Sequence, residues 1–154
     1  MKVVVAVVGK PRDAALAALI RDYETRACRY WPLHIVEVRG ESAKGVSVEQ
    51  VRERESARLL AAIATAATVV VCDALGVGQT SEAFSAWLQQ ERERARDVAF
   101  VIGGAFGLAP SVRTRAQRTL ALAPWTVPHE LARLVLAEQL YRAGTIVRGE
   151  PYHK

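Results

Sequence analysis

Residues that could form a ligand-binding site gather where the later apolar runs of the chain end. Gly103 and Gly104 directly follow one such run, and Gly107 stands three residues further on. Paired glycines let a backbone approach a ligand closely or adopt a positive φ, although a plain tight turn is the better explanation when they are taken alone. Cys72 and Asp73 end an earlier run. They would face the same crevice, because open α/β sheets bind ligands at the carboxyl ends of their strands.

A stiff segment and a histidine come later in the chain. Residues 122–128 (LAPWTVP) contain two prolines and a tryptophan, so the main chain here cannot all be hydrogen-bonded internally. Such a loop could recognise the edge of an adenine, or could simply be a rigid connection. His129 stands at the start of the last expected helix, where the positive helix end disfavours an imidazolium ion. A neutral, proton-accepting histidine is one interpretation, and a capping or half-buried histidine is the other.

Several familiar sites are missing from the sequence. Gly9-Lys10 is followed by Pro11 and lacks the upstream glycine of a P-loop, so no nucleotide-triphosphate cradle is expected. The first strand is not followed by GxGxxG, and no GxSxG elbow is present. The cysteines, Cys28 and Cys72, have neither CxxC spacing nor a nearby histidine pair. Their placement argues against a metal site and favours a reducing cytoplasm.

The composition is that of an ordinary globular protein rather than a disordered one. The chain has 154 residues, of which 51% are hydrophobic and 24% charged, and its formal net charge is +5. Most of the basic residues are arginine, whose planar side chain suits phosphate and makes nucleic acid a natural partner. A GC-rich genome, which favours arginine and alanine, explains this composition slightly better than nucleic-acid binding does. The apolar run Val3–Val8 is too short to cross a bilayer and lacks the flanks of a secretory signal, so no membrane partner is expected.

Short apolar runs alternate with helical patterns along the whole chain. Strands are expected at Val3–Val8, Leu33–Val38, 69–71, Val98–Ile102 and near 119–123. Helices are expected between them, opened by a capping box of Ser47 and Gln50, by Thr80 or Ser81, by Pro110 and, for the last helix, by about His129. This alternation predicts an α/β fold with a mainly parallel sheet and helices on both faces. Without an internal repeat or linker, residues 1–154 are expected to form a single domain.

The last helix is apolar on nearly every side and yet contains Arg133, Glu138 and Arg142. Such a helix must be covered on nearly every side, and one small sheet cannot do this, so a second subunit is expected. Glu138 and Arg142 are four residues apart on one face and are expected to pair, whereas Arg133 is left free to meet an anion. A surface helix of apolar composition is the alternative.

Three segments are diagnostic of a known family: DVAFVIGGAFGL, TVPHELARLVLAEQLYRA and IVRGEPYHK. Together with the opening MKVVVAVVGKPRD, they resemble the RlmH-type ribosomal RNA methyltransferases of the SPOUT class, over the whole length of the chain. The resemblance implies an enzyme that uses S-adenosylmethionine to methylate N3 of a pseudouridine in large-subunit (23S) ribosomal RNA, at the intersubunit face. It also implies a homodimer and a C-terminal trefoil knot, which topology rules alone would exclude.

By the same resemblance, one set of residues holds the methyl donor. The set is Cys72, Gly103, Leu122, Ala123, Pro124, Trp125, Thr126 and Val127. Family members usually carry leucine in place of Cys72 and Leu-Ser in place of Leu122-Ala123, and Pro124 has no amide hydrogen. Carbonyl and apolar contacts to the donor are therefore expected here. No metal is expected.

The implied reaction needs a positioned base and a stabilised anion. Methyl transfer from a sulfonium is an in-line displacement, and the N3–H of pseudouridine must be lost. We assign Arg142 as an electrostatic clamp, Tyr152 as a platform for the base, and His129 or His153 as the proton acceptor. The ten residues after Gly144 span at most roughly 35 Å when extended, enough to reach the site of either subunit. In a two-fold dimer the partner's site is the nearer one, so delivery across the interface is favoured.

Two other functions are compatible with the sequence. A non-catalytic ribosome-binding or assembly factor of the same fold would bind RNA without methylating it. A methyltransferase for another RNA, such as tRNA, would share the donor site and differ in substrate. Each of the three functions is expected in the cytoplasm.

Overall fold

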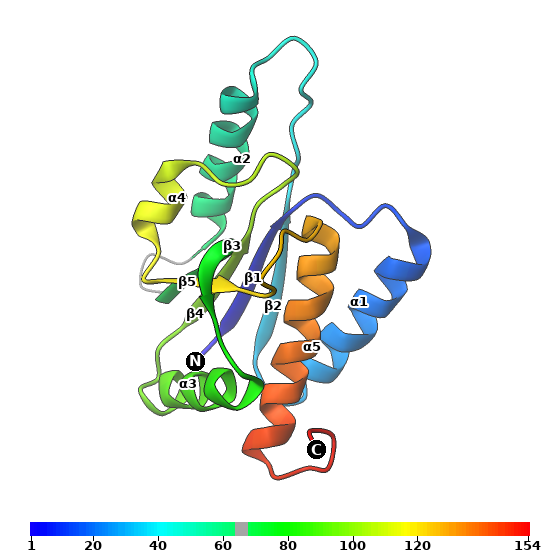
Figure 1. Cartoon of the computed structure of the whole chain (residues 1–154), viewed down its shortest axis with the longest axis vertical. Coiled ribbons are helices and arrows are strands. Elements are labelled where there is room, and N and C mark those ends of the chain that lie inside the picture. The colour runs from blue at the N-terminus through cyan, green and yellow to red at the C-terminus, as the bar shows by residue number, and fades with distance from the viewer. Residues whose placement is uncertain (64–67) are drawn as a thin grey trace.

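The strands of this protein are short runs of apolar, mostly β-branched residues, as is typical of a parallel sheet that is buried on both faces. The computed structural model describes residues 1–63 and 68–154 (Figure 1). The strands are β1 (Val3–Val8), β2 (Leu33–Val38), β3 (Thr68–Gly78), β4 (Val98–Ile102) and β5 (Arg118–Ala121). The helices are α1 (Ala14–Ala27), α2 (Val48–Ala62), α3 (Ser81–Glu93), α4 (Pro110–Arg115) and α5 (His129–Val147).

The sheet has the order β2-β1-β4-β3-β5, and each neighbouring pair is parallel. Side chains alternate along β4, so each face of the sheet has its own core. Phe100 belongs to the core beneath α1, α3 and α5, and Val101 belongs to the core beneath α2 and α4. The predicted fold class, a parallel α/β sheet with helices on both faces, is confirmed. The trefoil knot stays a prediction.

The predicted bounds of β1, β2 and β4 match the structure, but β3 is much longer than predicted. Its apolar part pairs with β4 only as far as Val71, and the chain then continues extended to Gly78 by pairing with β5. The register with β5 shifts between Cys72 and Val77. The sequence pattern missed this extension because most of it is not buried, so its residues are not uniformly apolar.

The predicted helix starts are found in the structure. Ser47 and Gln50 form the capping box of α2, in which each side chain bonds the backbone amide of the other. Of the two candidates for α3, Thr80 is the cap, and its hydroxyl accepts from the amide of Ala83 at 3.2 Å. α4 begins at Pro110, as expected of proline in a first turn. None of the described helices is long and apolar enough to cross a bilayer.

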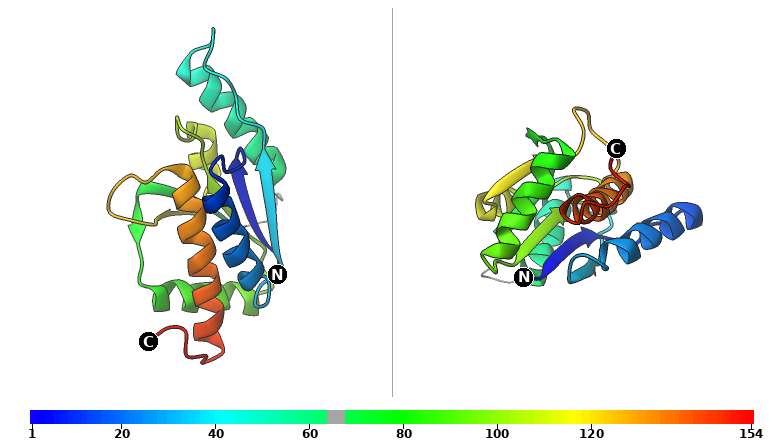
Figure 2. Two further views of the ribbon diagram at one scale, coloured as in Figure 1. Left: turned by 90° about the vertical axis from the view of Figure 1, so that its right-hand side faces the viewer. Right: turned by 90° about the horizontal axis from the view of Figure 1, so that it is seen from below.

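Helix α5 is covered largely by its own chain. It lies between α3 and α1 on one face of the sheet, as the view from below shows (Figure 2). Leu136 and Leu140 are fully buried in this position. The exposed apolar side chains of α5 are Leu131, Val135 and Val147. A second subunit is therefore not needed to explain most of the helix's apolar surface, and the homodimer stays a prediction that depends on the exposed part.

The prediction that Arg133 is free to meet an anion is wrong. Its guanidinium is buried and binds Glu24 of α1 through Nε at 2.7 Å and Glu37 of β2 through Nη1 at 2.6 Å. Burial alone would lower the pKa of Arg133, but the hydrogen bonds to both carboxylates outweigh this effect and raise the pKa. The three side chains tie α5 to α1 and to the edge strand β2. By contrast, the predicted pair of Glu138 and Arg142 is confirmed.

We expect Arg133→Ala to lower the free energy of unfolding by about 3 kcal/mol at pH 7, because it leaves the buried carboxylate of Glu24 and the more exposed carboxylate of Glu37 without their partner. Urea unfolding at pH 7 measures this. Arg21→Ala, on the exposed side of α1, is the control and should change stability by less than about 0.5 kcal/mol. Equal, small losses for the two variants would show that the contacts of Arg133 do not hold α5 in place.

Candidate functional site

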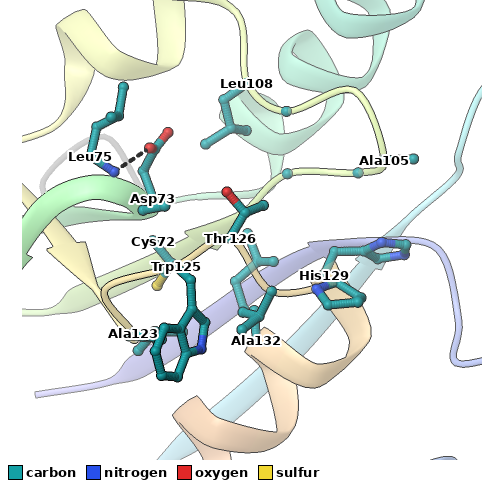
Figure 3. A pocket seen from close by; sticks show the side chains of 18 residues that line it. Cys72, Asp73, Leu75, Ala105, Leu108, Ala123, Trp125, Thr126, His129 and Ala132 are labelled. Carbon is teal, nitrogen blue, oxygen red and sulfur yellow. Dashed lines mark hydrogen bonds between the residues drawn. The ribbon is translucent and has the colours of Figure 1, made fainter.

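A pocket of about 840 Å³ opens at the carboxyl ends of β4 and of the apolar part of β3 (Figure 3). Its walls come from three segments far apart in sequence: residues 72–75, residues 102–108, and the loop from β5 into the first turn of α5. The lining residues are Cys72, Asp73, Ala74, Leu75, Ile102, Gly103, Gly104, Ala105, Gly107, Leu108, Leu122, Ala123, Trp125, Thr126, Val127, Pro128, His129 and Ala132. The volume is in the usual range for a site that encloses a small organic ligand.

The glycines of one wall let the chain fold tightly on itself. The amide of Gly107 donates to the carbonyl of Gly104 at 3.0 Å, and Gly107 has a φ of +78°. A Cβ added to Gly103 would lie 2.9 Å from the carbonyl carbon of Gly107 and from Cγ of Leu108. The tight-turn interpretation is therefore correct, and the same turn also forms part of the pocket wall.

Cys72 and Asp73 lie in the opposite wall. Burial, helped by the charge of Asp73, raises the pKa of the Cys72 thiol to about 12, so the sulfur is an uncharged surface at neutral pH. Asp73 accepts from the amide of Leu75 at 2.9 Å and forms an ion pair of 2.6 Å with Arg113 of α4. These contacts fix the chain where β3 leaves the sheet interior and shifts register against β5.

The loop from β5 to α5 closes the pocket. Trp125 stands at its edge with 72% of its surface exposed, and Thr126 lies between Cys72 and His129 in Figure 3. His129 is the first residue of α5, and the helix has no side-chain cap there because its N-cap is Pro128. Every residue that the resemblance implied for the methyl donor lines the pocket except Pro124, which is exposed.

The other predicted catalytic residues form a separate group at the opposite end of α5. The guanidinium of Arg142 binds the carboxylate of Glu138, with a distance of 2.9 Å from Nε, and lies 4.7 Å from the ring centroid of Tyr152. The hydroxyl of Tyr152 donates to the same carboxylate at 3.0 Å. Its ring packs against Tyr141, with 4.5 Å between the ring centroids. Burial and hydrogen bonds to Tyr23 and Glu138 raise the pKa of Tyr152, so its phenol is neutral at physiological pH.

His153 uses both ring nitrogens in this arrangement. Nη1 of Arg142 lies 3.3 Å from its Nδ1, and Nε2 lies 2.8 Å from the carboxylate of Glu82 in α3. Since a guanidinium can only donate, the geometry fits a ring with its proton on Nε2. Hydrogen bonds from its own backbone amide, from His153 and from Thr80 lower the pKa of Glu82 to about 2, which keeps this partner ionised. The chain end is therefore bound to α3 and α5.

The two groups lie on different parts of α5, so the chain as described does not bring the predicted catalytic set together. The helix has 19 residues from His129 to Val147, and His129 and Arg142 are 13 positions apart, which is about 20 Å. Figure 1 shows the C-terminus at the end of α5 that lies away from the pocket loops. His153 is six residues beyond Val147 and reaches at most about 21 Å back along the helix. A span of about 35 Å was expected for a tail that begins after Gly144. This value is too long, because α5 continues to Val147 and the tail begins only after that residue.

Some residues of both groups were not expected from the sequence. Arg113 and Leu75 belong to the first group, and Glu82 and Tyr141 belong to the second. The sequence carried no local signal for these contacts, because Arg113 and Glu82 are far in sequence from Asp73 and His153, the residues they bind. Among the described residues, no group of three or more histidine, cysteine or acidic side chains could hold a metal ion.

Comparisons with known proteins agree with this architecture. A family model described as "Predicted SPOUT methyltransferase" matches residues 1–153. The chain is 60% identical over 154 residues to "Ribosomal RNA large subunit methyltransferase H" of Gemmatimonas aurantiaca, and 46% identical to the protein of the same name from an Anaeromyxobacter species, strain Fw109-5. Each comparison covers 100% of both chains. A crystal structure of a hypothetical protein shares the fold with a TM-score of 0.53 at 16% identity, over 96% of this chain and 81% of the other. The chain belongs to the SPOUT methyltransferase family.

Proposed function

We propose that the protein transfers a methyl group from S-adenosylmethionine to N3 of a pseudouridine in large-subunit ribosomal RNA. The observation that carries this proposal is the pocket, whose lining includes all the expected donor residues but Pro124. The names of the full-length relatives support ribosomal RNA as the substrate. The net charge of +5 and the abundance of arginine suit a phosphate-rich partner.

The pocket has properties that suit a methyl donor. S-adenosylmethionine supplies an activated methyl group on a sulfonium, and the residues around it have to position it for in-line attack. The backbone of Gly103 and Gly104 and the loop 122–127 offer carbonyl and apolar surfaces for this purpose. Cys72 is the strongest potential nucleophile of the pocket wall. Since the raised pKa keeps its thiol protonated at neutral pH, it does not compete with the RNA for the methyl group.

The acceptor side of the site needs groups that the donor pocket lacks. As N3 of the pseudouridine forms its bond to the methyl carbon, it loses its proton, and the negative charge on the ring must be stabilised until then. Arg142 supplies a positive charge, and Tyr152 supplies an aromatic face. His129 at the pocket and His153 in the tail are the two candidates for the proton acceptor. In the conformation described, Arg142 and His153 are occupied by Glu138 and Glu82, so they must exchange these partners for the RNA.

The separation along α5 favours a site shared between two subunits. The tail is bound beside Glu138 and Arg142 of its own chain, away from its own pocket, and it can meet the pocket of a partner placed antiparallel across a two-fold axis. Exposed apolar side chains lie beside the pocket, on the outer part of β3, on the loop before α5 and on α5 itself. They are Leu75, Val77, Trp125, Leu131 and Val135. A concentration of such residues is unusual for a monomer and suits an interface between two copies of the chain.

The donor pocket is tested by Gly103→Val. The added side chain would collide with the backbone at Gly107, displace the turn and lower affinity for S-adenosylmethionine at least tenfold. Titration calorimetry measures the affinity, and transfer of labelled methyl groups to ribosomes that lack the modification measures the activity. Gly78→Val is the matched control, since a Cβ at Gly78 meets no atom within 4 Å. A wild-type protein that binds ribosomes but neither binds nor uses the donor would instead be a non-catalytic ribosome-binding factor.

The dimer is tested by Leu131→Glu. Leu131 is 42% exposed in the single chain, so a charge there should leave the fold intact and weaken self-association by at least tenfold. Sedimentation velocity over a range of concentrations measures this. Leu19→Glu is the control, because Leu19 is equally exposed, at 45%, but lies on α1. If the wild type sediments as a monomer at every concentration, the shared site is ruled out.

A further inference from the structure

Helix α2 does not line the pocket, yet three of its side chains hold the segment that does. The segment is residues 103–109, which we call the donor turn, and Figure 1 shows the chain between β4 and α4 passing beside α2. Nε of Arg52 donates to the carbonyl of Phe106 at 3.1 Å, and the amide of Ala109 donates to Oγ of Ser56 at 2.9 Å. Glu55 lies between these two contacts. The three positions are three and four residues apart and therefore share one face of the helix.

The two carboxylate oxygens of Glu55 differ in their hydrogen bonding. Glu55 is only 5% exposed, and its Oε1 accepts a hydrogen bond from the amide of Glu41 at 2.9 Å. Oε2 is fully buried and has no hydrogen-bond partner among the described residues. It lies against the donor turn, because a Cβ added to Gly104 would be 2.7 Å from it. Burying a carboxylate oxygen without a hydrogen-bond donor costs free energy of folding, so the position of Oε2 beside the backbone of Gly104 calls for an explanation.

The donor turn is placed between α2 and the pocket. Gly103, Gly104 and Gly107 line the pocket, and the same short stretch of backbone meets Arg52, Glu55 and Ser56 on its other side. A glycine-rich turn has many accessible conformations, so the contacts from α2 determine which one faces the ligand.

We propose that Arg52, Glu55 and Ser56 are positioning residues of the methyl-donor site. They hold the donor turn in the conformation that binds S-adenosylmethionine, and Oε2 of Glu55 accepts an amide hydrogen of the turn once the donor is bound. The inference rests on the proposed function, since it assigns the donor to this pocket. It places the control of donor affinity on a helix across the sheet from α5.

Two variants test this inference on the full-length protein. Glu55→Gln keeps the size of the side chain but puts an amide in place of one carboxylate oxygen, and Arg52→Ala removes the bond to Phe106. Each should weaken binding of S-adenosylmethionine in calorimetry roughly fivefold or more, as expected when a hydrogen bond of ordinary strength is lost. The neighbouring exposed residues provide the controls, Glu53→Gln and Arg54→Ala, which should bind the donor as the wild type does.

Kinetics separate positioning from a merely structural role. If the residues position the methyl donor, their removal raises KM for S-adenosylmethionine, while kcat at saturating S-adenosylmethionine and KM for ribosomes stay unchanged. Arg52→Lys should keep most of the affinity that Arg52→Ala loses, because lysine can also donate a hydrogen bond. Hydrogen exchange gives a second measurement. Donor binding should protect the amides of residues 103–109 in the wild type, and protect them less in Glu55→Gln.

Unchanged donor affinity in Arg52→Ala and Glu55→Gln, with normal binding by the wild type, would overturn the inference. A lower melting temperature with unchanged affinity would assign these residues to folding alone and would also overturn it. If Glu55→Gln does not fold, Arg52→Ala decides, because Arg52 is partly exposed. If the wild type itself binds no S-adenosylmethionine, the proposed function has failed. That outcome differs from the one that overturns this inference alone, in which the wild type binds S-adenosylmethionine and the variants bind it equally well.

Discussion

Helix α5 is a rigid spacer between the pocket and the residues that hold the chain end. It is anchored to α1 and β2 by the buried contacts of Arg133 with Glu24 and Glu37, and to α3 by packing. Its first turn forms part of the pocket, and its last turns hold Arg142 and the chain end. His129 at the pocket and Arg142, which contacts the tail residue His153, are 13 positions apart on this helix, or about 20 Å, so the two groups stay separate in the conformation described. This separation supports the proposal that two chains share a site.

The two ends of α5 differ in how firmly their parts are held. The pocket is built from backbone turns fixed from outside, by Asp73 with Arg113 on one wall and by the side chains of α2 on another. The tail is held by the packing and hydroxyl of Tyr152 and by the partly exposed polar contacts of His153 with Glu82 and Arg142. Partly exposed contacts of charged and polar side chains contribute little to stability, so those of His153 can be exchanged for RNA at small cost. A preformed pocket and a releasable tail are what a shared site requires.

The sequence predicted those parts of the fold that local physics determines. Buried strands such as Val98–Ile102 were located from their apolar runs, and the start of α2 was located from the pairing of Ser47 with Gln50. Interactions between distant residues were beyond such reasoning. The partners of Arg133 are 109 and 96 residues away, and nothing local marks them. The second half of β3 was missed because its pairing with β5, not its composition, keeps it extended. The donor residues came from family resemblance, and the structure brings most of them together while separating His129 from the tail.

The most direct test of the shared site is a purified mixed dimer with two defects. One subunit ends at Pro151 and keeps its pocket; the other keeps its tail but carries Gly103→Val. If each tail serves the partner's pocket, one intact pocket meets one intact tail, and methylation of ribosomes should recover to about half the number of working sites in the wild type. Each defective homodimer alone should be inactive. A mixed dimer that is as inactive as the two homodimers would show that each tail acts within its own subunit, and would contradict the proposal that two chains share a site.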